Sequence, residues 1–135
     1  MKIALIMVSS ILATISHAQK IASASDSLLI GTWKGTSICQ VKSSPCNDEI
    51  SVYHVTKGTK PNTYHIAANK VVNEKEEEMG AFDYDFDVTT QILSYRDHQR
   101  NTAWNFKVAN HRMEGTLVYK DQLYRIIKLT KTDTK

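Results

Sequence analysis

Two histidines, His54 and His65, resemble half of a metal site. A hairpin that turns around residues 58–62 and pairs Thr56 with Thr63 also places the two imidazoles opposite each other. Imidazole nitrogens bind zinc and other transition metals, but a site usually needs at least three protein ligands, and the pattern supplies no third. Two half-buried or exposed histidines are the simpler interpretation. We expect no metal and no other cofactor, and whether the pair forms part of a metal site stays open.

Three aspartates, Asp83, Asp85 and Asp87, alternate along one segment. In a strand, side chains two residues apart share a face and lie about 6.6 Å apart. That spacing is wide for a shared calcium ion, whose oxygen ligands lie within about 2.6 Å of the metal, and the glycine-turned loop of calcium hands is missing. The acids indicate a solvated strand face. Together with the glutamates at 76–78, they alternatively offer a negative patch to a basic partner protein.

Candidate nucleophiles lack the setting that serine hydrolases use. Ser37, Ser51 and Ser94 have no glycine-flanked elbow around them. With five glycines in the chain, there is also no glycine-rich loop to hold a phosphate. We therefore expect a binding protein rather than an enzyme.

The two cysteines, Cys39 and Cys46, flank a turn-forming stretch that includes Pro45. In an exported chain, an even number of cysteines favours a disulfide over a thiol catalyst or a metal site. We predict that the bridge closes the tip of the first hairpin. In the loop-entropy model it stabilises the fold by about 2.5 kcal/mol.

Export is indicated by the start of the chain. Lys2 precedes a mostly apolar run over residues 3–15, and Ser16-His17-Ala18 has the small-x-small pattern of a cleavage site. The run is too short to cross a membrane, which takes about 20 apolar residues. We expect a signal peptide over residues 1–18 and a secreted or periplasmic mature protein that begins at Gln19.

Strands must position the residues discussed above. Residues 19–27 are rich in Ala and Ser and are expected to form a linker, and residues 28–135 a single domain. Within that domain, short segments rich in Val, Ile, Thr and aromatic residues recur about every ten residues between turn-forming clusters, which is typical of all-β folds. The predicted strands are 32–39, 49–57, 63–69, 81–89, 92–96, 103–109, 112–119 and 123–131.

Alternation along these strands predicts one apolar and one polar face. Trp104, Phe106 and Val108, for example, alternate with Asn105 and Lys107. Mostly short turns favour an eight-stranded antiparallel up-and-down barrel, whose closure removes exposed sheet edges. Residues 71–72 are expected to prolong the third strand before residues 74–78 run out into solvent.

The first strand resembles that of the calycins. It opens with Gly31-Thr32-Trp33, and an apolar turn precedes it. In calycins a basic side chain of the final strand crosses this tryptophan, so the resemblance implies that Arg125 packs on Trp33, a contact worth about 0.5–2 kcal/mol. The chain is also similar to small exported bacterial lipocalin-like proteins of undetermined function. That similarity is carried by 31–37 with Cys39, then by 46–49, 79–80, 104–106 and 115–117.

The lipocalin-like resemblance and the aromatic face together imply small-ligand binding. We expect a small apolar or aromatic ligand, with the barrel packed solid by its own side chains as the competing possibility. The expected pocket residues are Phe82, Tyr84, Phe86, Trp104, Phe106 and Tyr119. An alternative function is a protein-binding module, such as an inhibitor of a secreted hydrolase, acting through Asp97, His98 and Arg100. The net charge of +3 gives no reason to expect nucleic acid or membrane as a partner.

Overall fold

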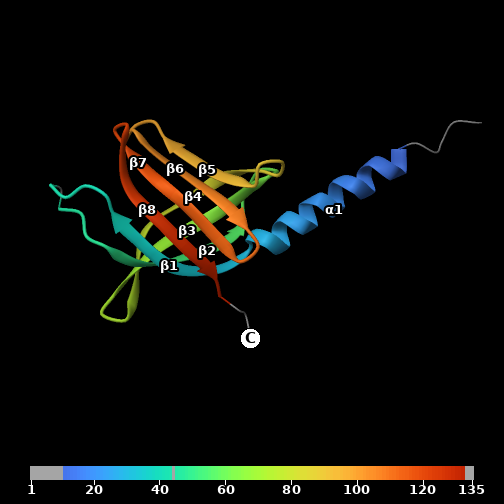
Figure 1. Ribbon diagram of the computed structural model, residues 1–135. Coiled ribbons are helices and arrows are strands. Elements are labelled where there is room, and N and C mark those ends of the chain that lie inside the picture. Colours follow the sequence, from blue (N-terminus) through green and yellow to red (C-terminus); the bar gives the residue numbers. More distant parts are fainter. Residues whose placement is uncertain (1–10, 44, 133–135) are drawn as a thin grey trace, which may run out of the picture.

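The computed structural model describes residues 11–43 and 45–132, which form one helix and a closed β-barrel (Figure 1). Each strand pairs antiparallel with the next, and the first pairs with the last. The predicted eight-stranded up-and-down barrel is confirmed in that form. The elements are α1 (Ile11–Leu29), β1 (Gly31–Cys39), β2 (Glu49–Lys57), β3 (Thr63–Val72), β4 (Lys75–Asp87), β5 (Ile92–Asp97), β6 (Thr102–Ala109), β7 (Arg112–Tyr119) and β8 (Gln122–Lys131).

The β3–β4 hairpin is longer than the sequence predicted. Residues 75–78 belong to β4 instead of leaving the sheet, and the ribbon projects from the barrel at the end opposite α1 (Figure 1). Asn73 and Glu74 both have positive φ, 51° and 66°, as in the two-residue turns that match strand twist. The charged run concealed this strand because a ribbon that is exposed on both faces needs no alternation of apolar and polar residues.

The β2–β3 register also differs from the prediction. The observed pairs are Thr56 with His65 and His54 with Ala67. The predicted pairing of His54 with His65 is therefore wrong by two residues. Thr63 lies closer to the turn than expected, because its carbonyl accepts a hydrogen bond from the amide of Gly58 at 2.9 Å. A shift of two residues keeps every side chain on its face, so both histidines still lie on the outside of the barrel.

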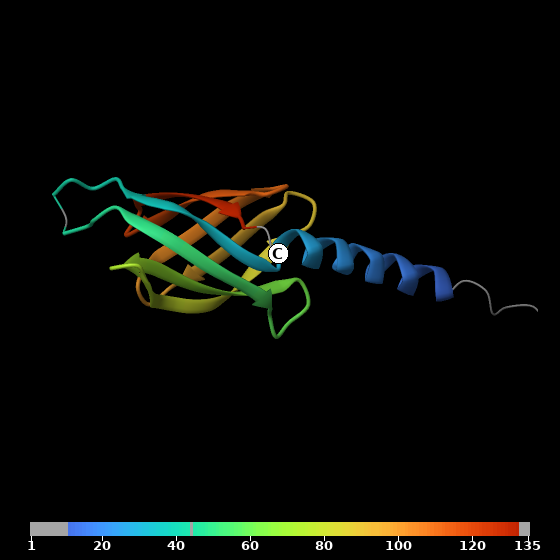
Figure 2. The same ribbon diagram turned by 90° about the horizontal axis from the view of Figure 1, so that it is seen from below.

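The helix α1 includes the segment that was expected to be a linker. Residues 19–27 are helical, in keeping with the high helix propensity of alanine. The helix extends away from one end of the barrel (Figures 1 and 2). The first ten residues of the predicted signal peptide lie outside the described residues. No helix in the described part of the chain is long and apolar enough to cross a membrane.

The last turns of α1 are bonded to the barrel. The Asp26 carboxylate accepts hydrogen bonds from Lys57 Nζ at 2.7 Å and from the Tyr64 hydroxyl at 2.6 Å. These bonds lower the pKa of Asp26, with Lys57 as the larger cause. Leu29 at the end of the helix is fully buried. The helix therefore ends in a fixed position over this end of the barrel.

Trp33 closes the α1 end of the barrel from within. It is fully buried, as expected, and its Nε1 donates to the Leu29 carbonyl at 2.9 Å. The basic side chain beside it is Lys131, whose Nζ lies 5.7 Å from the centroid of the indole ring. The same Nζ donates to the backbone oxygen of Ser27 at 2.8 Å, which satisfies a carbonyl in the last turn of α1.

Arg125 does not contact Trp33, and the contact implied by the calycin resemblance is wrong. The β1–β8 register pairs Trp33 with Lys131 and Cys39 with Arg125. Arg125 precedes Lys131 by six residues in β8 and therefore lies towards the opposite end of the barrel. At that end the predicted disulfide joins Cys39 to Cys46, with 5.9 Å between the two Cα atoms.

Large side chains fill the half of the barrel nearest α1. Fully buried residues here include Val55, Tyr64, Val108 and Met113. Gly115 allows β6 and β7 to approach closely above this layer, since an added Cβ would lie 2.0 Å from the Asn105 carbonyl oxygen. The apolar core is thus a plug at one end.

The anchoring of α1 by Asp26 should depend on pH. A carboxylate with a lowered pKa stabilises the fold above its unfolded pKa, and this contribution is lost as the pH falls through its folded pKa, below about pH 4. Because Asp26 is partly exposed, we expect Asp26→Asn to cost about 1 kcal/mol or less at pH 7. Urea unfolding at several pH values should show this difference shrink as the pH is lowered below about 4. A difference that stays constant would contradict the assignment.

The close approach of β6 and β7 predicts a sharp response at Gly115. Gly115→Ala should destabilise the fold by about 1–3 kcal/mol, because the new methyl meets backbone that has nowhere to move. Gly80→Ala is the matched control, since its methyl would meet the edge of the Phe82 ring at 3.0 Å and that side chain can shift. Chemical denaturation measures both variants. Equal small losses would show that the two strands are not held this closely.

Candidate functional site

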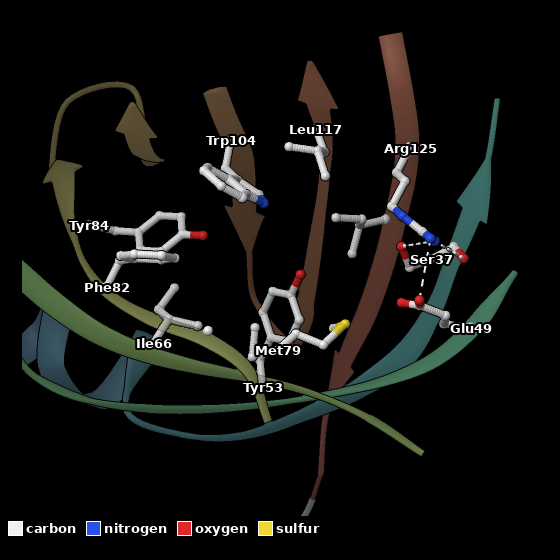
Figure 3. Close-up of a pocket in the computed structure, with 13 residues that line it drawn as sticks. Ser37, Glu49, Tyr53, Ile66, Met79, Phe82, Tyr84, Trp104, Leu117 and Arg125 are labelled. Carbon is white, nitrogen blue, oxygen red and sulfur yellow. Dashed lines mark hydrogen bonds and ion pairs between the residues drawn. The ribbon is translucent and has the colours of Figure 1, made fainter. Parts of the chain in front are cut away.

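A cavity of about 200 Å³ occupies the half of the barrel away from α1 (Figure 3). It lies above the apolar plug and reaches solvent beside Met79, which is 45 % exposed. The interior is therefore open at one end and solid at the other.

Small residues and a β-bulge create this space. Ala68 of β3 pairs with Gly80 of β4, and both line the cavity. The next pair is Asn69 with Glu78, so Met79 is an extra residue on β4. A bulge bends its strand and redirects side chains, which here places Met79 at the edge of the cavity. The rest of the aliphatic lining comes from Ile66, Leu117 and Ile127.

Aromatic side chains form one wall. Phe82, Tyr84 and Trp104, all predicted pocket residues, line the cavity on one side (Figure 3). Tyr95, which the sequence analysis did not single out, stacks on Phe82 with 4.6 Å between ring centroids. Only residues 85–87 of β4 pair with β5. Beyond these residues, the contacts among the aromatic side chains close the wall.

The other three predicted pocket residues lie elsewhere. Phe86 and Phe106 point into the barrel but are buried in the plug, where Phe106 packs edge-on against Tyr53. Tyr119 lies at the end of β7, is 39 % exposed, and makes an edge contact with Tyr124. Alternation predicted the face of these residues correctly for β4 and β6. It carries no information on the position of a residue along the barrel axis, and this position decides whether an inward side chain belongs to the plug or to the cavity.

A polar cluster faces the aromatic wall. Arg125 Nη2 lies 3.3 Å from Glu49 Oε1, and Nη1 donates to the Ser37 hydroxyl at 3.2 Å and to its carbonyl at 3.3 Å (Figure 3). The Arg125 and Glu49 side chains are 12 % and 18 % exposed. The cluster therefore places a largely desolvated ion pair at the mouth of an apolar cavity.

Sequence reasoning missed this cluster because the resemblance assigned Arg125 to Trp33. A usable signal was present. Arg125 lies two and four positions before the inward-facing Ile127 and Leu129, so it shares their face of β8. Glu49 lies four positions before Tyr53 and shares its face of β2. A charged residue at an inward position of two different strands indicates a polar pair inside the barrel.

Two tyrosine hydroxyls also belong to the polar lining. Those of Tyr53 and Tyr84 point into the cavity (Figure 3), and among the described residues neither has a protein hydrogen-bond partner. Burial raises the pKa of both, and for Tyr53 the nearby Glu49 carboxylate raises it further. Both groups thus stay neutral and are free to donate or accept.

His54 and His65 each pair with a separate carboxylate on the outer surface. His54 Nε2 lies 2.8 Å from Glu76 Oε1, and His65 Nδ1 lies 2.7 Å from Asp83 Oδ1. The hydrogen bond with His65 is the main cause of a lowered Asp83 pKa. In the part of the chain that the structure describes, no three ligating side chains gather into a group that could hold a metal ion.

The Asp97–Arg100 segment, proposed as an inhibitory loop, is a short turn between β5 and β6. Asp97 Oδ1 accepts hydrogen bonds from the backbone amides of Gln99 and Arg100, both at 3.1 Å. The Asp97 carboxylate is thereby used to brace the turn. Of the proposed residues, His98 and Arg100 are exposed, Arg100 at 77 %.

Comparisons of this chain with protein-family models, with curated proteins and with solved structures find no match. The function must therefore be argued from the cavity.

The Arg125–Glu49 pair should couple energetically. Arg125→Met leaves the Glu49 carboxylate desolvated without its partner, and Glu49→Met does the same to the guanidinium. We expect each change to cost about 1–3 kcal/mol, less than for a fully buried pair because both side chains still touch water. The double variant should lose less than the sum of the two, which a double-mutant cycle of unfolding free energies measures. Arg100→Met removes a guanidinium that is 77 % exposed; it is the control and should change stability by about 0.5 kcal/mol or less. Strict additivity would rule out the coupling.

Proposed function

We propose that this protein is an exported, lipocalin-like binding protein that holds a small apolar or aromatic molecule in the cavity. The observation that carries the proposal is the cavity itself. It is concave, its walls are mostly apolar and aromatic, and its few polar groups gather at one side, which is the usual composition of a small-molecule site.

The volume of the cavity limits the size of the ligand that it can hold. Sites for drug-sized molecules usually measure about 300–1,000 Å³, and this cavity is smaller, about 200 Å³. A single aromatic ring with a short substituent suits the volume better than a porphyrin or a long fatty acid. The plug around Trp33 closes the other end, so a longer ligand has no second exit.

Binding suits the polar groups better than catalysis. The Ser37 hydroxyl accepts from Arg125, and a guanidinium stays protonated in proteins and therefore does not act as a general base. The histidines that might serve as bases lie on the outer surface, paired with Glu76 and Asp83.

Export and the lipocalin-like assignment rest on separate features. The apolar run after Lys2 and the Cys39–Cys46 disulfide support an oxidising compartment outside the cytosol. A closed eight-stranded barrel that opens with Gly31-Thr32-Trp33, and a basic Lys131 beside that tryptophan, support the lipocalin-like kind.

Ligand binding should change the fluorescence of Trp104. We expect small aromatic compounds to perturb it on titration, and porphyrins, as a size control, not to enter. Trp33 is sealed in the plug, so the response should disappear in Trp104→Phe.

A pair of variants tests whether binding occurs in the cavity. Ala68→Met fills the cavity and should weaken binding by about tenfold or more, whereas Ala67→Met adds the same side chain on the outer face and should leave binding unchanged. If no compound perturbs Trp104, or if both variants bind as well as the wild type, the cavity is not a binding site.

A further inference from the structure

The polar groups of the cavity carry no net charge. Arg125 and Glu49 are 3.3 Å apart and form one ion pair, and the remaining polar groups of the lining are uncharged: the hydroxyls of Ser37, Tyr53 and Tyr84 and the indole N–H of Trp104. Because transfer of an unpaired charge into a desolvated site is costly, the charge balance of the lining constrains the charge of the ligand.

Both members of the ion pair keep hydrogen-bonding capacity. Arg125 uses Nη1 for Ser37 and one Nη2 proton for Glu49, so its Nε proton and the second Nη2 proton remain. Glu49 uses Oε1 for this bond, and a carboxylate has two acceptor oxygens. Donor and acceptor groups thus lie side by side at the mouth of the cavity.

The two tyrosine hydroxyls extend this pattern into the cavity. Each can donate and accept, and burial keeps both protonated. They add hydrogen bonds without adding charge.

From this arrangement we infer that the cavity selects a ligand with an aromatic or compact apolar body and a head group that has no net charge and both donates and accepts hydrogen bonds, as a carboxamide does. The inference rests on the proposed function and specifies its ligand class. The apolar body lies against Phe82, Tyr84 and Trp104, and the head group lies beside the intact Arg125–Glu49 pair.

Charged head groups fit less well. A ligand carboxylate competes with Glu49 for one guanidinium and places two negative charges close to each other. An ammonium group can pair with the Glu49 carboxylate, but the Arg125 guanidinium repels it. Glu49 is therefore the residue that excludes carboxylates, and Arg125 is the residue that excludes cations.

Three ligands with one phenyl body test the inference. They are 3-phenylpropionamide, 3-phenylpropionate and 3-phenylpropylamine, titrated against Trp104 fluorescence and checked by calorimetry at pH 7. The wild type should bind the amide at least about tenfold more tightly than either charged compound. Glu49→Gln keeps an oxygen that accepts from Arg125 but removes the negative charge, and it should tighten carboxylate binding by about tenfold or more. Glu77→Gln, at an exposed position of β4, is the matched control and should leave the order unchanged.

The possible outcomes separate the two proposals. Binding that Ala68→Met weakens shows that the ligands enter the cavity, and the binding function then stands. In that case, the inference on ligand charge is wrong if the wild type prefers the carboxylate or if Glu49→Gln does not improve carboxylate binding. If Glu49→Gln does not fold, the order of affinities in the wild type still decides. If none of the three ligands binds either protein, both proposals fail.

Discussion

The pairing of β1 with β8 is the interaction on which the rest of the structure depends. It closes the barrel and fixes what lies at both ends: Trp33 beside Lys131 at one, and Cys39 beside Arg125 at the other. Gly35 permits the close approach, since a Cβ there would lie 1.9 Å from the Lys128 carbonyl oxygen. A slip of one residue would turn every side chain of β8 to the opposite face, which would remove Lys131 from the helix end and Arg125 from the cavity together.

Within the closed barrel, side-chain size decides where the interior is filled. An eight-stranded barrel is just wide enough for side chains to fill it. Towards α1 the inward positions hold large residues such as Trp33, Tyr64 and Met113, and they pack solidly. Towards the other end they include Ala68 and Gly80, and the cavity lies beside them. The same wall therefore provides a rigid base and a hollow upper half, which suits a site that is formed before its ligand arrives.

The charged groups inside and outside the barrel have different roles. On the outer surface, His54 with Glu76 and His65 with Asp83 are exposed pairs of the kind that contribute little to stability. Arg125 is largely desolvated, and its charge is tolerated there because Glu49 and Ser37 satisfy it. Replacing such a pair with apolar residues of similar volume often leaves stability unchanged, so the pair is weak evidence for a stabilising role.

Eight strands, the inward faces of β4 and β6 and the pairing of the cysteines follow from the sequence alone, although the first part of β4 does not. Alternation with a period of two residues is a local property, and it is enough to assign Phe82, Tyr84, Trp104 and Phe106 to the inward face. Register between strands is a property of the folded barrel. It sets which basic residue meets Trp33, keeps His54 and His65 from facing each other, and brings Arg125 to Glu49 across 76 positions of sequence. The height of each inward residue, and so its place in the plug or the cavity, likewise depends on register. Periodicity repeats identically along a strand and cannot specify these offsets, because they are set by turn geometry and by closure of the barrel.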